Sequence, residues 1–178
     1  MKKVLVISFL ISFTLVTSQF IDNVEAKSLK NVKTVTLVSD KKAADFKLKT
    51  LEGKEIRLSD YRGKIVIIDF WATWCPPCRK GIPDLISLQE EFKKDLVVIG
   101  ISLDQQNTIK DLKPFIENYK INYPVVLGDE KVVKDYGGIS AIPTSFIIDQ
   151  KGNIVDSHVG LVPKAVYADQ IKSLLKKK

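Results

Sequence analysis

The chain has 178 residues, of which 45% are hydrophobic and 28% charged, and its formal net charge is +7. The lysines are dispersed except for a final Lys176-Lys177-Lys178, and no basic helix carries the interleaved aromatic residues of a surface that tracks nucleic acid. The charge therefore indicates a soluble, lysine-rich surface. Weak attraction to anionic lipid or to an acidic partner is the alternative.

The N-terminus has the pattern of a signal peptide. Two lysines at positions 2 and 3 precede an apolar run over 4–16, which has the length of a signal-peptide core. Small residues at positions 24 and 26 predict cleavage after Ala26, so 1–26 is expected to be a signal peptide. An uncleaved anchor is the alternative, although Ser, Thr and Gln interrupt the stretch over 4–21. No cysteine lies near this site, which excludes a lipid-modified N-terminus.

About 150 residues then remain, which suits one domain with its own core. Residues 27–42 are predicted to be a linker, and 43–178 the domain. The domain opens with two short strands around Glu52-Gly53, a β-hairpin signal. A continuous β-branched run over 64–70 then predicts a strand that is covered on both faces.

Helical and strand patterns alternate through the rest of the chain. Apolar residues at helical spacing predict a helix over 78–92, with an expected kink at Pro83. The following segments are predicted to be a buried strand, a helix, a short strand and a short helix, over 96–103, 108–119, 123–129 and 130–138. A hairpin and a final amphipathic helix end the chain. The helix, over 163–178, is expected to turn four apolar residues toward the core: Val166, Ile171, Leu174 and Leu175.

The two cysteines of the chain, Cys75 and Cys78, stand in one Cys-Pro-Pro-Cys directly after the first buried strand. So short a loop removes little entropy from the unfolded chain, which makes the pair a poor structural staple. A structural zinc site needs about four ligands, and the single His158 is too distant in sequence to complete one. No metal site is therefore predicted, and His158 is assigned a surface or packing role. A redox-active dithiol is the remaining interpretation.

The segments VIIDFWATWCPPC (66–78), GGISAIPTSFIID (137–149) and GNIVDSHVG (152–160) resemble the thioredoxin superfamily. The long connection between the two halves and the exported context resemble its TlpA/ResA-like branch of extracytoplasmic thiol-disulfide oxidoreductases. The resemblance covers roughly 43–175. It implies an α/β thioredoxin-like fold: a central mixed β-sheet flanked by helices, with an N-terminal β-hairpin and a central insertion.

The resemblance also implies a function. An exported protein of this branch would reduce disulfides in extracytoplasmic proteins, as in cytochrome c maturation or related thiol homeostasis. Its substrates would be disulfide-containing proteins, and a membrane carrier of the DsbD/CcdA type would supply the electrons. The protein would need no cofactor beyond the Cys75–Cys78 disulfide, and it would be periplasmic or lie at the outer face of the cytoplasmic membrane.

The spacing of the motif predicts different tasks for its residues. A thiolate attacks a disulfide, and the N-terminus of a helix would stabilise a thiolate on Cys75. Pro76 and Pro77 suit a first helical turn, where no N–H is missed. One turn further on, Cys78 would lie beneath Cys75 and resolve the mixed disulfide. Trp74 is predicted to cover one side of the site or simply to pack, whereas the neighbouring Trp71 is assigned to the core.

Ile142-Pro143 is the second predicted part of the site. In the superfamily the matching bond is cis and lies against the dithiol, where the N–H and C=O of the preceding residue can pair with a substrate polypeptide. Substrate binding is therefore assigned to five residues: Trp74, Pro76, Pro77, Ile142 and Pro143. An ordinary trans proline at the start of a strand is the alternative.

One acid departs from the branch. TlpA/ResA-like chains commonly have a neutral residue where Asp69 stands and Glu where Gly81 stands, whereas Asp69 matches the buried acid of ordinary thioredoxin. A buried carboxyl group could take the proton of Cys78 as a general base, and purely structural hydrogen bonding is the alternative. The missing Glu weakens the link to cytochrome c maturation. Three further acids that follow strands are predicted to be turn residues: Asp104, Asp129 and Asp149.

Two other classes of protein compete with the oxidoreductase. A thiol peroxidase of the peroxiredoxin type shares the fold, but it needs Thr or Ser three residues before its reactive cysteine, and this chain has Ala72 there. A non-catalytic chaperone or assembly module would not need the intact dithiol. Consumption of peroxide distinguishes the first alternative, and the effect of Cys75→Ser on function distinguishes the second.

Overall fold

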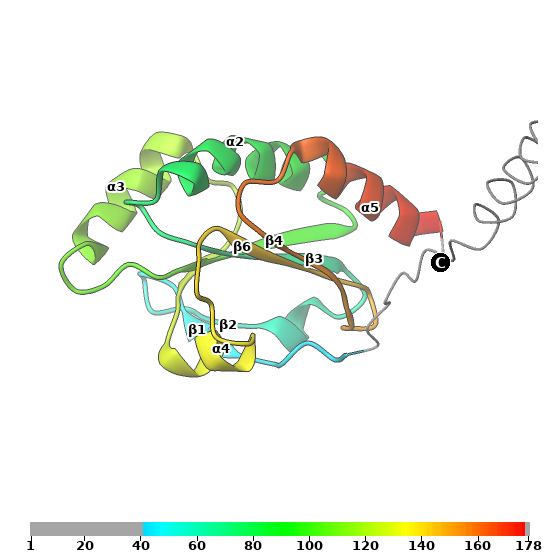
Figure 1. Ribbon diagram of the computed structural model, residues 1–178, viewed down its shortest axis with the longest axis horizontal. Coiled ribbons are helices and arrows are strands. Elements are labelled where there is room, and N and C mark those ends of the chain that lie inside the picture. Colours follow the sequence, from blue (N-terminus) through cyan, green and yellow to red (C-terminus); the bar gives the residue numbers. More distant parts are fainter. Residues whose placement is uncertain (1–40, 177–178) are drawn as a thin grey trace, which may run out of the picture. The chain divides into compact units, whose positions relative to one another are not determined.

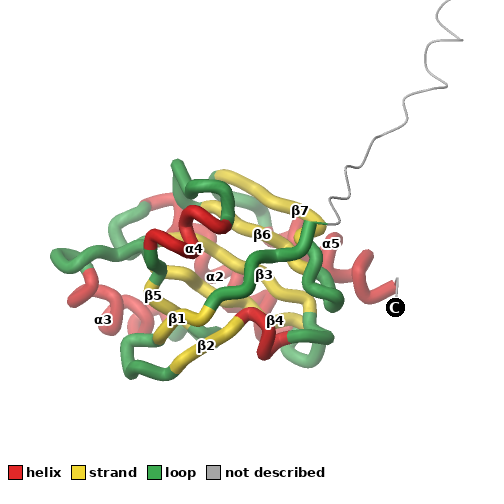
Figure 2. Tube along the Cα trace, turned by 90° about the horizontal axis from the view of Figure 1, so that it is seen from below, coloured by secondary structure: helices red, strands yellow, loops and turns green. Residues whose placement is uncertain are grey.

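The computed structural model describes residues 41–176, so the predicted signal peptide and most of the predicted linker lie outside the described residues. Its centre is a five-stranded sheet with the order β5-β4-β3-β6-β7 (Figures 1 and 2). The strands are β3 (Ile65–Trp71), β4 (Leu96–Ser102), β5 (Val125–Leu127), β6 (Thr144–Ile148) and β7 (Ile154–Val159). The first three are mutually parallel, and β6 is antiparallel to both of its neighbours, so the sheet is mixed as predicted.

The middle strand, β3, is buried along its whole length. Its β-branched residues suit a strand whose two faces both meet other layers. Figure 1 shows α2 (Pro76–Glu91), α3 (Ile109–Tyr119) and α5 (Lys164–Lys176) on one face of the sheet. The other face carries the hairpin of β1 (Lys47–Lys49) and β2 (Glu55–Arg57), the 3₁₀ turn η2 (Leu58–Tyr61) and α4 (Glu130–Asp135). Alternate residues of β3 enter the two hydrophobic cores that result.

The N-terminal hairpin has the predicted form. β1 and β2 pair antiparallel, and Gly53 in the turn has φ +82°, a conformation that residues with a Cβ rarely adopt. Pairing begins just before the predicted start of the domain, where Lys42 bridges to Asn153 in the turn between β6 and β7. The backbone carbonyl oxygen of Lys41 also accepts a hydrogen bond from the N–H of Ile154, at 2.9 Å. Ordered pairing therefore includes the last two residues of the predicted linker.

One helical prediction needs correction. Val166 was expected in the core, but it is 38% exposed, and the buried residues of α5 are Tyr167, Ala168 and Ile171. The helix is therefore rotated so that Tyr167, a residue with a polar tip, meets the sheet. Helix α2 continues through Pro83 to Glu91. Among residues 41–176, no helix combines the length and apolar character needed to cross a membrane.

The sheet topology brings three loops together. Because β3 and β4 are parallel, with Trp71 opposite Ser102, their C-terminal ends lie at the same edge of the sheet. β6 is antiparallel to β3 and pairs Thr144 with Phe70, so it begins at this edge. The loops that leave β3 and β4 and the loop that enters β6 therefore meet where the Cys-Pro-Pro-Cys motif stands.

Candidate active site

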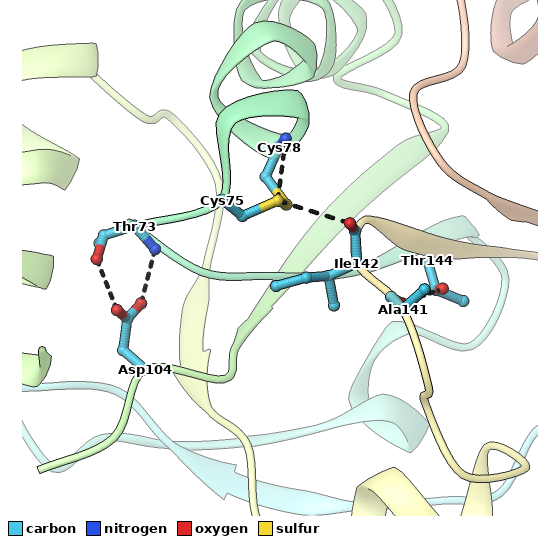
Figure 3. The surroundings of a disulfide bond; sticks show 7 residues. All are labelled: Thr73, Cys75, Cys78, Asp104, Ala141, Ile142 and Thr144. Atoms are coloured by element: carbon cyan, nitrogen blue, oxygen red, sulfur yellow. Dashed lines mark hydrogen bonds between the residues drawn. A yellow bond between two sulfur atoms is a disulfide. The ribbon is translucent and has the colours of Figure 1, made fainter.

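The cysteine motif forms the start of α2. Cys75 is the N-cap residue, Pro76 is the first helical residue, and the N–H of Cys78 points at the Cys75 sulfur over 3.3 Å. The two cysteines form a disulfide, with their Cα atoms 5.3 Å apart (Figure 3). Prolines fit here because the N–H groups of a first turn have no partner within the helix. The unpaired N–H groups that remain make this end of α2 favourable for a thiolate.

The loop before β6 lies directly against this disulfide. The Ile142-Pro143 bond is cis, as the resemblance implies, and the carbonyl oxygen of Ile142 lies 3.6 Å from the Cys75 sulfur (Figure 3). The N–H of Gly160, just after β7, donates a hydrogen bond of 2.7 Å to the carbonyl of Pro143. The loop is thus held between the dithiol and the end of β7.

Asp69 is a buried acid beneath the motif. It lies in β3 between Gly100 of β4 and Ser145 of β6, and only 5% of it is exposed. Burial alone raises the pKa of its carboxyl group to about 8. The group can therefore exchange a proton near neutral pH, which an exposed aspartate cannot do.

A small cavity joins Asp69 to the second cysteine. Its volume is about 20 Å³, roughly the room that one water molecule needs. The cavity is lined by the acid, the resolving cysteine and residues of the surrounding loops and helices: Asp69, Cys78, Gly81, Leu85, Pro143, Gly160, Leu161, Val162 and Tyr167. A much larger hollow on the opposite face, between β1 and α4, contains no cysteine and lies away from this chemistry.

Gly81 leaves space that Leu161 fills. A Cβ built on Gly81 would lie 3.1 Å from Cδ1 of Leu161, and both residues line the cavity with Asp69. The position where the resemblance leads one to expect Glu therefore faces the same cavity as the acid on the strand. Leu161 is 49% exposed, so its side chain has room to move aside.

The two tryptophans have different surroundings. Trp71 is fully buried and packs against Phe115 of α3, with ring centroids 5.2 Å apart, so it belongs to the core as predicted. Trp74, next to Cys75, is 57% exposed. Val159 and Leu161, which flank Gly160, are also exposed apolar residues. Apolar side chains therefore stand on the surface beside both Cys75 and the loop of Pro143.

Asp104, which is predicted to be a turn residue, also holds the loop that carries the motif. Its carboxylate accepts hydrogen bonds from the N–H and the hydroxyl of Thr73, at 3.0 and 2.6 Å (Figure 3), and from the hydroxyl of Ser102, at 2.8 Å. These bonds fix the loop that leads into Cys75. The signal was its position after β4, since parallel strands end at a common edge of the sheet. His158 contacts Tyr167 and Asp156 and does not line the cavity.

A thioredoxin-like fold with a bonded Cys-Pro-Pro-Cys at the start of a helix defines the chain as a thiol-disulfide oxidoreductase. Comparison with known proteins agrees. The chain is 38% identical over 138 residues to the thiol-disulfide oxidoreductase ResA of Bacillus thuringiensis (strain Al Hakam), covering 77% of this chain and 76% of the relative. It is 36% identical over 133 residues to the thioredoxin-like protein YneN of Bacillus subtilis (strain 168), covering 74% and 78%.

A solved structure and a family model also match the chain. The crystal structure of a putative thiol:disulfide interchange protein DsbE from Chlorobium tepidum matches with a TM-score of 0.70 and 34% identity, over 76% of this chain and 96% of that one. The model of the AhpC/TSA family matches residues 39–157, and the chain belongs to this family. These relatives confirm the predicted fold class and the resemblance to ResA.

Proposed function

We propose that the protein reduces disulfides of other proteins outside the cytoplasm, with Cys75 as the attacking residue. The observation that carries the proposal is the position of Cys75 at the N-cap of α2, 3.6 Å from the carbonyl oxygen of Ile142. A substrate strand that pairs with the main chain of Ile142 would bring its own disulfide to this sulfur. Exposed Trp74, next to Cys75, and exposed Leu161, next to Gly160, would offer apolar contacts to such a strand.

The proposed reaction has two exchange steps. The Cys75 thiolate attacks one sulfur of the substrate disulfide, a mixed disulfide forms, and the other substrate sulfur leaves as a thiolate. Cys78 then loses its proton and attacks the Cys75 sulfur, which releases the second substrate sulfur. The substrate gains two electrons and the protein ends in the Cys75–Cys78 disulfide. In the disulfide form both cysteines are almost fully buried, so this division of tasks rests on the helix N-terminus and not on exposure.

We further propose Asp69 as the base for the second step. It shares a cavity with Cys78, and its raised pKa lets it accept and release a proton near neutral pH. A carboxylate on Asp69 would take the Cys78 proton as the second sulfur attacks. The role that the branch gives to a Glu in α2 would then fall to a residue of β3, on another wall of the same cavity.

Export is proposed from the sequence, and the partners are proposed from the likeness to ResA. The signal-peptide pattern over 1–26 supports a periplasmic location or one at the outer face of the membrane. A reductant in such surroundings needs a supply of electrons, which a membrane carrier of the DsbD/CcdA type would provide. Substrates in cytochrome c maturation, or in related thiol homeostasis, fit the likeness to ResA. No cofactor beyond the dithiol is needed for this exchange.

Redox equilibrium tests the proposal directly. The purified protein would be equilibrated with glutathione buffers, and the redox state of Cys75 and Cys78 would be measured in the native host by thiol trapping. A reductant should have a potential below that of the glutathione couple and be mostly dithiol in the cell. A pair that is fully oxidised in the cell would contradict reduction and indicate an oxidase.

The peroxidase alternative has its own test. The residue three positions before Cys75 is Ala72, which is fully buried and has no hydroxyl group to bind a peroxide. The dithiol form should therefore consume hydrogen peroxide no faster than free thiols of similar pKa do. A rapid reaction with peroxide that is lost in Cys75→Ser would make the protein a peroxidase.

A further inference from the structure

A buried hydroxyl group, that of Tyr167, belongs to a residue that lines the cavity with Asp69, and it pairs with a second buried hydroxyl, that of Ser145. The hydroxyl oxygens of Tyr167 in α5 and Ser145 in β6 are 2.8 Å apart, and the two residues are 5% and 2% exposed. A buried hydroxyl needs a hydrogen-bond partner. Only one of the two hydroxyls can donate to the other in this pair. If Ser145 donates to Tyr167, the hydroxyl proton of Tyr167 remains available for another acceptor.

The sheet register places this pair beside the acid. Ser145 is the direct partner of Asp69 in the antiparallel pairing of β3 and β6, and partners of this kind project from the same face of the sheet. Tyr167 lines the cavity together with Asp69 and Cys78. The acid, the resolving cysteine and the tyrosine therefore meet at one hollow, and Ser145 holds the tyrosine from the sheet side.

No cation serves Asp69 within residues 41–176. Its neighbour on β4 is Gly100, where an added side chain would meet the rings of Trp71 and Tyr123, and α2 contributes Cys78. Tyr123 and Tyr167 are the titratable groups that interact electrostatically with Asp69. Burial keeps the pKa of each above its ordinary value, so both are neutral near pH 7. The neutral hydroxyl of Tyr167 lines the same cavity and is a donor that can stabilise a carboxylate there.

We propose that Tyr167, held by Ser145, donates a hydrogen bond to ionised Asp69 across the cavity and so positions the proton acceptor for Cys78. The cavity has room for one water, which can carry this bond if the two groups do not meet directly. Tyr167 touches neither substrate nor sulfur in this role and is a positioning residue. The inference rests on the proposed role of Asp69 as base.

The proton balance of the step defines what should be measured. The Cys78 proton passes to the Asp69 carboxylate, the Cys78 sulfur bonds to the Cys75 sulfur, and the substrate sulfur leaves with the electron pair of the broken bond. The rate of this step should rise with pH as Asp69 ionises. A donor such as Tyr167 favours the ionised form, because it bonds more strongly to a carboxylate than to a neutral acid.

The test compares two tyrosine variants. Resolution of a preformed mixed disulfide would be followed by stopped flow from pH 6 to 10 in the parent, Tyr167→Phe and Tyr136→Phe. Tyr136 is the matched control: it is 7% exposed, its hydroxyl donates to the carbonyl of Ala44 at 2.9 Å, and it belongs to the other core. In Tyr167→Phe the midpoint of the rise should move up by about one pH unit, with an unchanged plateau, so the rate below the midpoint falls about tenfold.

The outcomes separate this inference from the role of Asp69. If Tyr167→Phe follows the parent profile, or if Tyr136→Phe moves it equally, Tyr167 is not the donor. In Asp69→Asn the rise that follows the carboxyl group should be replaced by a slower one that follows ionisation of the Cys78 thiol itself. Adding Tyr167→Phe to Asp69→Asn should then leave that profile unchanged. Asp69→Asn with the parent profile would instead overturn the base itself. A carboxyl ¹³C titration of Asp69 in reduced Tyr167→Phe should show the same upward shift, and an unchanged titration would contradict the inference.

Discussion

Asp69 connects the sequence, the fold and the chemistry of this protein through one carboxyl group. It interrupts an otherwise apolar strand, so folding carries it out of water with no cation among residues 41–176 to balance its charge. Burial raises the pKa of the carboxyl group to about 8. The group lines the same cavity as Cys78. At the scale of the residue, burial of this carboxyl group therefore lowers the free energy of unfolding and also makes the group able to act as a base near neutral pH.

Kinetics should show the gain. We predict that Asp69→Asn slows resolution of the mixed disulfide by about 10²-fold, the usual effect of losing a general base. Adding Gly81→Glu should restore part of the rate, because position 81 lines the same cavity and Leu161 has room to move. Stopped-flow turnover from pH 6 to 8 measures both effects. If Asp69→Asn behaves as the parent throughout, Asp69 is a structural residue.

Equilibrium unfolding should show the cost. Burial raises the pKa of the native carboxyl group to about 8, whereas the unfolded group has its ordinary pKa of 3.8. Between these values the native state binds more protons, so the contribution of Asp69 lowers the free energy of unfolding as the pH rises. Each pKa unit is worth about 1.4 kcal/mol, so Asp69→Asn should be more stable than the oxidised parent by a few kcal/mol at pH 8.

The comparison at low pH provides the control. Below about pH 3 the carboxyl group is protonated in both states, because the pKa of the unfolded group is 3.8, so the parent and Asp69→Asn should have similar free energies of unfolding there. Urea titrations of the oxidised proteins at several pH values measure the difference. A gap between the two proteins that does not change with pH would show that the native pKa of Asp69 is not raised.

At the scale of elements, the dithiol depends on how the loop between β3 and α2 is held. Asp104, at the end of β4, bonds both the N–H and the hydroxyl of Thr73, two residues before Cys75. This link ties the approach to the motif to the neighbouring parallel strand. The position of Cys75 relative to Ile142 therefore depends on a residue of β4 as well as on α2.

Replacement of Asp104 should loosen this loop. Asp104→Ala leaves the N–H of Thr73 without its partner, so we expect a loss of about 1–2 kcal/mol in the free energy of unfolding and slower attack by Cys75. Asp129→Ala is the control, since Asp129 caps α4 through the N–H of Val132 at 2.7 Å, and a lost cap costs about 1 kcal/mol. Insulin reduction should fall in Asp104→Ala only. Equal rates in the two variants would make Asp104 a plain turn residue.

Local patterns predicted most elements correctly, and tertiary geometry explains the rest. β-branched runs indicated β3 and β4, and turn residues indicated the hairpins, because these signals are local. The prediction that Val166 of α5 lies in the core is wrong, because packing against the sheet turns Tyr167 inward instead. The link between Asp104 and Thr73 joins residues 31 positions apart, and the cavity gathers residues from several elements. No local pattern contains such contacts.

At the scale of the whole molecule, the proposal joins an oxidoreductase domain to an export signal. The signal-peptide pattern ends at Ala26, and a predicted linker of 16 residues separates it from the domain. If cleavage occurs there, intact-mass measurement of the protein from its native host should give a chain that begins at Lys27, recovered outside the cytoplasmic membrane. A mass that still includes 4–16 would support the membrane anchor instead.

The central claim is that Cys75 attacks and Cys78 resolves, and trapping of mixed disulfides in the native host tests it most directly. Cys78→Ser should accumulate covalent complexes with substrate proteins, because the attacking sulfur remains and the resolving sulfur is gone. These complexes should be visible on non-reducing gels and should separate into their two proteins when a reductant cleaves the mixed disulfide. Cys75→Ser should accumulate none. Complexes that form with Cys75→Ser and are absent with Cys78→Ser would contradict the account.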